Sequence, residues 1–273
     1  MQNLNKRVAV LGLGKMGGIL LQAFLEKGLI SRENTFGTDK YPDRVEALGK
    51  EFGIHVTTDN AEAARCADVI LLCVKPQTVK EVAEVIRPEL NPEKLIISIA
   101  ASVPSSYIEN LVGAEIPVVR CMPNTPCVIG CGMTGICKGR YADHPHLELA
   151  RTLFEAVGRT VIVDEKHMDA VTGLSASGPA YIYVILESLA EAGVKVGLPR
   201  DVATLLAAQT ALGASKVVLE TGHHPALLKD AVTTPAGCTI DGLLELEEGK
   251  LRVTLIKAVV RAAERAKELL MCD

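Results

Sequence analysis

A glycine-rich turn between an apolar strand and an amphipathic helix constrains this chain more than any other feature of its sequence. The apolar run at 8–11 leads directly into Gly-Leu-Gly-Lys-Met-Gly at 12–17. Gly12 permits a tight turn, Gly14 lets the backbone approach a pyrophosphate, and Gly17 allows the next helix to pack closely on the strand. The helix N-terminus then offers unpaired N–H groups to phosphates. This context predicts a dinucleotide site and distinguishes the pattern from an ordinary glycine-rich turn.

The first half of the chain alternates β-rich runs with helical periods. Strands are predicted at 7–11, 35–38, 69–74, 95–99, 117–120, 131–137 and 159–163, and helices at 16–27, 42–52, 60–66, 79–90 and 105–111. Alternation of this kind is typical of an α/β fold in which helices cover a mostly parallel sheet.

The second half of the chain is predicted to be all helical, because no strand-like alternation remains beyond about Asp164. Helices are predicted at 166–174, 178–194, 199–221, 225–231, 239–248 and 250–270. We therefore expect a sheet domain over 1–164 and a helical domain over 165–273. The helices at 178–194 and 199–221 are apolar on nearly every face, which suits burial between subunits and predicts a homo-oligomer.

Composition and charge favour a small-molecule partner. The 273 residues are 48% hydrophobic and carry a net charge of −4, with no long run of Lys or Arg that would indicate nucleic-acid binding. The N-terminus lacks the features of a signal peptide. The apolar stretch at 180–196 is interrupted by Glu187, Glu191 and Lys195, so it is too short and too charged to span a bilayer. We expect a cytoplasmic protein that binds neither nucleic acid nor membrane.

The cysteines and histidines do not have the spacing of a metal site. The eight cysteines, at 66, 73, 121, 127, 131, 137, 238 and 272, form no CxxC pair, so we expect free thiols that act as small packing residues. His144, His146, His223 and His224 lie beside prolines, where solvated loop positions are expected. No metal is predicted.

Charged residues follow two of the predicted strands. Asp39 could accept a hydrogen bond from a ribose 2′-hydroxyl and favour NADH, whereas Lys40 and Arg44 could pair with a 2′-phosphate and favour NADPH. Asp39 could equally be a turn or cap residue. Lys75 follows Cys73 at the carboxyl end of a central strand, where open α/β sheets bind ligands. These residues leave the coenzyme open, with a slight preference for NADPH.

Several segments together resemble pyrroline-5-carboxylate reductases, the last enzymes of proline biosynthesis. The matching stretches are GLGKMG (12–17), CVKPQ (73–77), SIAAS (98–102), RCMPNTP (120–126), MDAVTGLSASGPAY (168–181), GLPRDVATLLAAQTALGASKVVLE (197–220) and DAVTTPAGCTIDGLLELEEG (230–249). The resemblance extends over nearly the whole chain. It implies reduction of 1-pyrroline-5-carboxylate to L-proline with hydride from NADPH or NADH, a Rossmann-type domain followed by an all-helical dimerisation domain, and assembly as a homodimer or a pentamer of dimers.

The resemblance also implies the site residues, which are carried over by position. Those expected to hold the cofactor are Leu11, Gly12, Leu13, Gly14, Lys15, Met16, Asn60, Val74, Lys75, Pro76, Ile99, Ala100 and Ala101, with Asn124 nearby. Gly17, Asp39, Lys40 and Cys73 join this set from the residues themselves. Those expected to surround the substrate are Glu165, Thr233, Thr234, Cys238 and Thr239. The active site is expected between the cofactor of one subunit and a loop of its dimer mate.

Four positions depart from the family pattern. Ala236, Ala176 and Ser102 stand where relatives have glycine, and Cys131 replaces a frequent glutamate. Ala236 lies in the loop expected to wrap the substrate carboxylate, so either its φ is negative or the loop is shifted. Substrate affinity is in question here more than reaction type.

The segment 233–239 and Ser177 are the remaining candidates for substrate contact. Backbone N–H groups of 233–239 can converge on a carboxylate at the start of the following helix. Thr239 is the candidate catalytic residue, and it either hydrogen-bonds the ring nitrogen or only caps that helix. Ser177 is predicted as the N-cap of the long helix after it, or as a substrate contact.

Two other functions compete with imine reduction. A β-hydroxyacid dehydrogenase needs a lysine on the first helix of the second domain, and the segment 181–192 contains none. A non-catalytic dinucleotide sensor needs an interaction element, and no basic recognition helix or interaction tail is present.

Overall fold

The computed structural model describes residues 3–113 and 115–269 and divides into two compact units. The first comprises Met1–Ser177 with Ala262–Asp273, and the second comprises Gly178–Arg261. Residues 165–177 belong to the first unit because Met168 is fully buried there and Val171 packs against Gly135. The domain boundary predicted after 164 stays a prediction.

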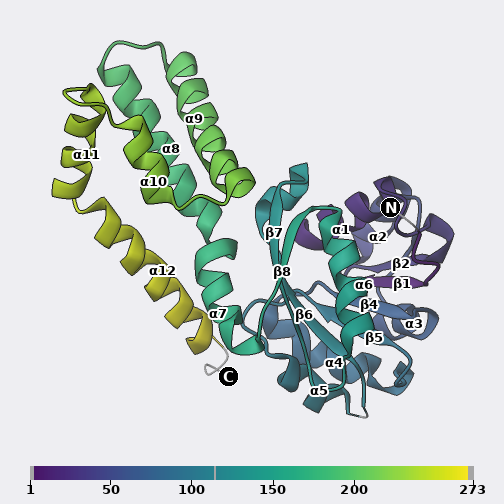
Figure 1. Cartoon of the computed structure of the whole chain (residues 1–273). Coiled ribbons are helices and arrows are strands. Elements are labelled where there is room, and N and C mark those ends of the chain that lie inside the picture. The colour runs from purple at the N-terminus through teal and green to yellow at the C-terminus, as the bar shows by residue number, and fades with distance from the viewer. Residues whose placement is uncertain (1–2, 114, 270–273) are drawn as a thin grey trace. The chain divides into compact units, whose positions relative to one another are not determined.

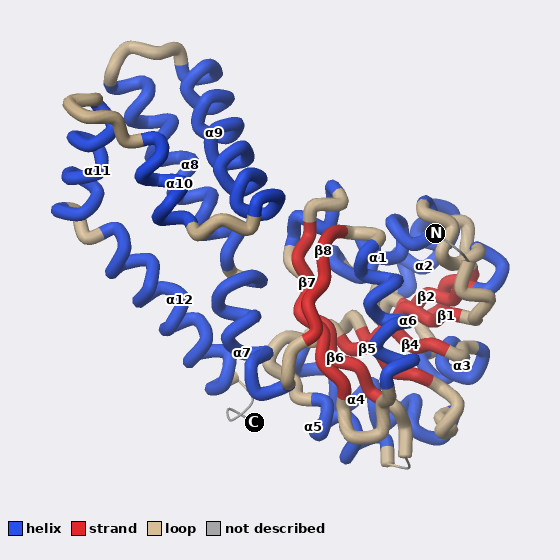
Figure 2. Tube along the Cα trace, viewed as in Figure 1, coloured by secondary structure: helices blue, strands red, loops and turns tan. Residues whose placement is uncertain are grey.

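An eight-stranded sheet forms the centre of the described part of the first unit (Figures 1 and 2). Its strands are β1 (Val8–Leu11), β2 (Thr35–Thr38), β3 (His55–Thr57), β4 (Val69–Leu72), β5 (Leu95–Ser98), β6 (Val118–Met122), β7 (Gly132–Lys138) and β8 (Gly158–Ile162). Their order is β3-β2-β1-β4-β5-β6-β7-β8, and only the β6–β7 pair is antiparallel. The predicted α/β class is confirmed.

Helices cover both faces of this sheet. They are α1 (Lys15–Glu26), α2 (Pro42–Phe52), α3 (Asn60–Cys66), α4 (Val79–Ile86), α5 (Ser105–Val112), α6 (His144–Glu155) and α7 (Met168–Val171). Strand β1 shows why two cores form: Val8 and Val10 pack into one cluster, while Ala9 and Leu11 pack into the other. Side chains of a strand alternate between faces, so a fully apolar strand must be covered twice.

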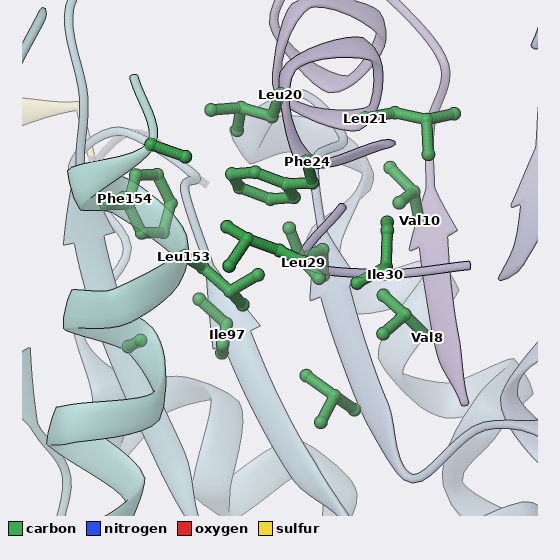
Figure 3. Close-up of a cluster of buried hydrophobic side chains, with 14 of the residues drawn as sticks. Val8, Val10, Leu20, Leu21, Phe24, Leu29, Ile30, Ile97, Leu153 and Phe154 are labelled. Carbon is green, nitrogen blue, oxygen red and sulfur yellow. The ribbon is translucent and has the colours of Figure 1, made fainter. Parts of the chain in front are cut away.

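The cluster that contains Val8 joins α1 to α6 (Figure 3). Phe24 of α1 and Phe154 of α6 are fully buried and meet edge to face, with ring centroids 6.1 Å apart. Edge-to-face pairs of this kind add about 1 kcal/mol to the stabilisation from buried area. Helix α6 is therefore part of the core of the sheet domain.

Helix α6 and strand β3 were not predicted from the sequence. The start of α6, His-Pro-His, has the composition of a turn, but Pro145 occupies the first turn of the helix, where its missing N–H costs nothing. Asp143 and His146 form a capping box at this end. The expectation that His144 and His146 lie in a solvated loop is wrong, because both belong to the first turn of α6. His223 and His224 do lie in the exposed connection before α10 (Pro225–Val232), where the His224 ring accepts the N–H of Ala226 as the N-cap.

The chain between α7 and the next long helix is wound as a π-helix over Thr172–Ala176. Ser177 has φ −82° and ψ −22°, and its N–H donates to the carbonyl of Thr172 at 3.0 Å. An N-cap residue has extended backbone angles, so the predicted N-cap role of Ser177 is wrong. The chain is already helical when it reaches this residue.

The second unit is built from helices, as predicted. They are α8 (Gly178–Lys195), α9 (Arg200–Thr221), α10, α11 (Cys238–Glu248) and α12 (Leu251–Glu268), the end of which is assigned to the first unit. Helices α8 and α9 approach closely where Gly193 faces Ala203, since a Cβ built on Gly193 would lie 2.7 Å from the Cβ of Ala203. Small residues at this contact bring the two backbones together.

Large apolar side chains of the second unit are exposed. Those more than half exposed include Tyr183, Val184, Leu205, Leu206, Leu212, Leu219, Leu227, Val232, Leu244 and Ile256. Helix α9 is also long and apolar enough to cross a membrane by length and composition, with a mean hydropathy of 1.5. The expected absence of membrane contact rests on the segment at 180–196, so it stays a prediction.

Candidate active site

A pocket of about 450 Å³ lies at the carboxyl edge of the parallel strands. Strand β1 is in register with its neighbours, so that its last residue, Leu11, pairs with Thr38 and Leu72. The loops that follow these strands therefore open at one edge, where α/β folds bind ligands. Predicted cofactor residues that line the pocket are Gly12, Gly14, Asp39, Lys40, Asn60, Cys73, Val74 and Lys75.

The glycine-rich turn has the geometry that phosphate binding requires. Gly12 has a φ of +97°, which L side chains rarely adopt. A Cβ built on Gly14 would meet no described atom within 4 Å, so it would project into open space. Gly14 also lines the pocket. A Cβ built on Gly17 would lie 2.2 Å from the carbonyl oxygen of Gly12, so α1 can pack here only without a side chain. Gly14 is also the N-cap of α1, and having no side chain it leaves the first N–H groups of the helix to a ligand.

The end of β2 fixes this turn through Thr38, a residue that sequence analysis did not single out. The N–H of Gly12 donates to the carbonyl and to the hydroxyl oxygen of Thr38, at 3.2 Å each. The Thr38 hydroxyl in turn donates to Oδ1 of Asn60 at 2.7 Å. This chain of bonds orients the Asn60 amide in the pocket wall. A hydroxyl residue at the last position of β2 was the signal that could have identified Thr38.

Asp39 and Arg44 form an ion pair in the same wall, with Oδ2 of Asp39 2.7 Å from Nη1 of Arg44. The other carboxylate oxygen accepts the N–H of Tyr41 at 3.0 Å. Arg44 also donates to the carbonyl of Leu13 at 3.1 Å. Asp39 therefore does have the turn role that the sequence left open, and the ion pair ties β2 to the glycine-rich turn.

Other predicted cofactor residues do not line the pocket. Leu11, Leu13 and Ala100 are buried in the core, and Gly17 packs on Gly12. The pocket is also lined by residues that were not predicted from the sequence, namely Thr38, Tyr41, Thr58, Thr78, Glu81 and Val82. The roles expected for Lys15, Met16, Pro76, Ile99 and Ala101 stay predictions.

Cys73 differs from Cys131 in burial and therefore in expected reactivity. Burial raises the pKa of the Cys73 thiol to about 12, whereas Cys131 is exposed. Because the thiolate is the reactive form, we expect iodoacetamide at about pH 8 to modify Cys131 well before Cys73. Mass spectrometry of peptides from a time course measures the order, and equal rates at the two sites would contradict it. Cys272 lies outside the described residues.

Among residues 3–113 and 115–269, no group of three or more His, Cys, Asp or Glu side chains is placed to hold a metal ion. The expectation of no metal stays a prediction.

Glu165 and Asn124, predicted near substrate and cofactor, both have structural partners. Glu165 accepts hydrogen bonds from the N–H and the hydroxyl of Ser105 at the start of α5, and it lies 3.6 Å from the buried Arg120. Asn124 donates to the carbonyl of Ser175 at 3.1 Å. Ser175 lies in the π-helical turn over Thr172–Ala176. Asn124 thus ties the segment after β6 to this turn.

The segment 233–239 lies in the second unit and leads into α11. The hydroxyl of Thr233 donates to the carbonyl of Lys229 at 2.9 Å, and the N–H of Gly237 donates to the carbonyl of Thr234 at 3.0 Å, which closes a turn. Gly237 is the N-cap of α11 and cannot cap it with a side chain. Cys238 and Thr239 follow as the first two helical residues, so the interpretation of Thr239 as an N-cap is wrong.

The turn before α11 contains Ala236 with a φ of +57°. The alternative that Ala236 has a negative φ is therefore wrong. Pro235 and Ala236 occupy the central positions of the turn, and the second of these favours glycine when φ is positive. Ser102, the other departure at a family glycine, also has a positive φ, of +64°. Both positions therefore have a backbone conformation that favours glycine.

Replacing Ser102 by glycine should raise the free energy of unfolding by about 1–2 kcal/mol. A left-handed residue with a Cβ costs about 1–2 kcal/mol, and the buried Ser102 hydroxyl has no hydrogen-bond partner among the described residues. The greater chain entropy of glycine in the unfolded state offsets part of this gain. Ala236→Gly, which relieves backbone strain alone, should gain less.

Urea unfolding of both variants measures these differences, with Ser102→Ala as the control that removes the hydroxyl and keeps the Cβ. A Ser102→Gly variant less stable than the parent would contradict the prediction.

Relatives of known name match nearly the whole of this chain. A relative from Methanosarcina acetivorans, named pyrroline-5-carboxylate reductase, is 45% identical over 97% of this chain and 98% of its own. A relative of the same name from Escherichia coli is 34% identical over 97% of this chain and 99% of its own. The chain belongs to the pyrroline-5-carboxylate reductase family. The resemblance noted in the sequence is thereby confirmed.

Family patterns and solved structures agree with this membership. The family described as pyrroline-5-carboxylate reductase dimerisation matches residues 165–269, and that described as NADP oxidoreductase coenzyme F420-dependent matches residues 7–102. The pyrroline carboxylate reductase of Plasmodium falciparum, solved with NADP bound, has a TM-score of 0.88 at 32% identity and covers 98% of this chain and 99% of its own. The reductase of Coxiella burnetii has a TM-score of 0.89 at 36% identity, covering 97% and 98%. A Rossmann-type sheet domain followed by helices is thus the shared architecture of this reductase family.

Proposed function

We propose that this protein reduces 1-pyrroline-5-carboxylate to L-proline with hydride from NADPH, the last step of proline biosynthesis. The observation that carries the proposal is the full-length match to reductases of this name, at 45% and 34% identity. The pocket beside the glycine-rich turn supports it, since it lies where such a fold binds a dinucleotide.

The residues of the pocket fit a dinucleotide phosphate group. The missing Cβ of Gly14 leaves space that a pyrophosphate can fill, and the start of α1 directs N–H groups toward it. The Plasmodium falciparum relative binds NADP, and we propose the same coenzyme here. When bound, the nicotinamide supplies the hydride.

The segment 233–239 is the proposed binding site for the substrate carboxylate. Gly237, the N-cap of α11, leaves the first N–H groups of the helix without a side-chain partner of its own, which suits an anion. Thr239, one residue into the helix, is half-buried, and its hydroxyl is proposed to donate a hydrogen bond to the ring nitrogen. This bond orients the C=N carbon toward the hydride. It also favours protonation of the ring nitrogen, which gains a proton on reduction.

The helical unit is proposed to form a homodimer, in which a loop of one subunit completes the active site of its mate. Exposed apolar residues on α8 and α9 support this assembly, because exposed apolar patches mark protein or membrane contacts. We also propose assembly into a pentamer of dimers and a cytoplasmic location. Size-exclusion chromatography with light scattering measures the oligomeric state, and a single species of the 29.1 kDa chain mass would contradict a homo-oligomer.

The activity itself is tested by mixing protein, NADPH and 1-pyrroline-5-carboxylate while following the absorbance of the reduced nicotinamide. We expect a decrease that depends on the imine, with L-proline as the product by mass spectrometry. A flat trace with coenzyme bound would favour the dinucleotide sensor. Turnover of β-hydroxyacids with NADP and not of the imine would favour the dehydrogenase.

A further inference from the structure

The residue directly after β2 is acidic, and its contacts change the coenzyme preference that an acidic residue at this position usually indicates. An acidic residue here usually accepts a hydrogen bond from the ribose 2′-hydroxyl and selects NADH, since a 2′-phosphate would face a negative charge. Asp39 occupies this position directly after β2 and lines the pocket. By sequence alone it argues against NADPH.

The contacts of Asp39 occupy both of its carboxylate oxygens. Oδ1 accepts the N–H of Tyr41 at 3.0 Å and Oδ2 accepts Nη1 of Arg44 at 2.7 Å. The side chain of Asp39 is only 5% exposed, whereas that of Arg44 is 47% exposed. A ligand that enters the pocket therefore meets the guanidinium before the carboxylate.

Arg44 is held in place from two sides. Nη1 donates to Asp39, and Nη2 donates to the carbonyl of Leu13 in the glycine-rich turn at 3.1 Å. A guanidinium has more N–H donors than these two bonds use, and its planar fork matches phosphate geometry. The anchored group is thus oriented before any ligand binds.

The charge of the pocket wall also favours an anion. Lys40, Arg44 and Lys75 line it together with the carboxylates of Asp39 and Glu81, so the cations exceed the carboxylates. Lys40 lies over the ring of Tyr41, 4.7 Å from its centroid, an interaction that holds its ammonium at the aromatic face. Arg44 is held by two hydrogen bonds and is still partly exposed.

We propose that Arg44, anchored by Asp39 and Leu13, binds the coenzyme 2′-phosphate and makes this protein select NADPH despite the acidic residue at the end of β2. The inference rests on the proposed function only in that the pocket holds a dinucleotide. Asp39 acts here as the partner that orients Arg44, so its carboxylate does not hydrogen-bond the ribose.

The test measures binding of two fragments that carry no nicotinamide, adenosine 2′,5′-bisphosphate and adenosine 5′-monophosphate, to the full-length protein by isothermal titration calorimetry. We expect the parent to bind the bisphosphate at least about tenfold tighter, because a charge-assisted hydrogen bond contributes about 1.5–3 kcal/mol. Arg44→Ala should reduce that ratio at least about tenfold while monophosphate binding persists.

Lys50→Ala is the matched control, since it removes a positive charge from the same helix, α2, at an exposed position that does not line the pocket. We expect it to change the ratio less than about threefold. A loss as large as that of Arg44→Ala would assign the preference to the general charge of α2 and overturn the proposal. Equal loss of both fragments in Arg44→Ala would overturn it too, because the pocket itself would then have changed.

Asp39→Asn tests whether the Asp39 carboxylate binds the ribose. Monophosphate affinity should stay within about threefold of the parent, since the ribose does not use this group. A tenfold loss would mean that Asp39 binds the ribose and would contradict the inference. A protein that reduces the imine but binds both fragments equally would refute this inference alone, and one that discriminates between them but leaves the imine unreduced would refute the proposed function alone.

Discussion

Replacing Thr239 by alanine should lower kcat for imine reduction by about ten- to a thousandfold, the range expected when a positioned proton donor is lost. Thr239 is the second residue of α11, and the N-cap position belongs to Gly237. Its hydroxyl is therefore not required to cap the helix. Steady-state kinetics with saturating coenzyme measure the effect, together with the midpoint of thermal unfolding.

Two control variants separate chemistry from structure at this loop. Thr239→Ser keeps the hydroxyl and should retain most of kcat. Thr233→Ala removes a hydroxyl that already donates to the carbonyl of Lys229, so it should affect stability more than kcat. An unchanged kcat in Thr239→Ala, accompanied only by lower stability, would contradict a catalytic role.

Replacing Gly17 by alanine should abolish dinucleotide binding and destabilise the sheet domain by about 3 kcal/mol, at the upper end of the range for overpacking. The new Cβ would lie 2.2 Å from the carbonyl oxygen of Gly12, a backbone atom that cannot move aside. Helix α1 would have to shift away from β1 and take its N-terminal N–H groups with it. Fluorescence titration with NADPH and unfolding in urea measure the two effects.

Gly18→Ala is the matched control in the same helix. Its built Cβ comes no closer than 3.6 Å to the ring of Phe52, so there is room for a methyl group. Alanine is also preferred over glycine within a helix by about 1 kcal/mol. We expect normal coenzyme binding and slightly greater stability, and a Gly17→Ala protein that behaves like Gly18→Ala would show that close packing at this turn is not required.

Most elements of the fold could be predicted because their hydrophobic periods are strong. The bounds of α9 and α10 were predicted within a residue or two, since proline and glycine mark their ends. The two missed elements, β3 and α6, have weak local signals. Strand β3 is only three residues long and exists because β2 offers it an edge, whereas α6 begins with a turn-like His-Pro-His and exists because Phe154 completes the core beside Phe24.

Residues of the candidate site could be predicted only where the role of a residue follows from its own chemistry and not from distant partners. Motif glycines have a role that follows from lacking a side chain, so Gly12, Gly14 and Gly17 could be assigned from their spacing between a predicted strand and a predicted helix. Thr38 escaped notice because its role depends on Gly12 and Asn60, which are distant in sequence. Ser177 was misassigned because Gly-Pro resembles a helix start, whereas the chain is already helical when it reaches Ser177.

By itself, the sequence determined the alternation of strands and helices, the phosphate-binding turn and the family to which the chain belongs. These follow from local periodicity and from residues whose chemistry needs no partner. Only the tertiary structure decided that Asp39 is paired with Arg44, that Ala236 and Ser102 have a backbone conformation that favours glycine, and that Thr239 lies inside its helix. Each of these depends on which atoms of distant segments come within bonding distance, and that is set by packing of the whole chain.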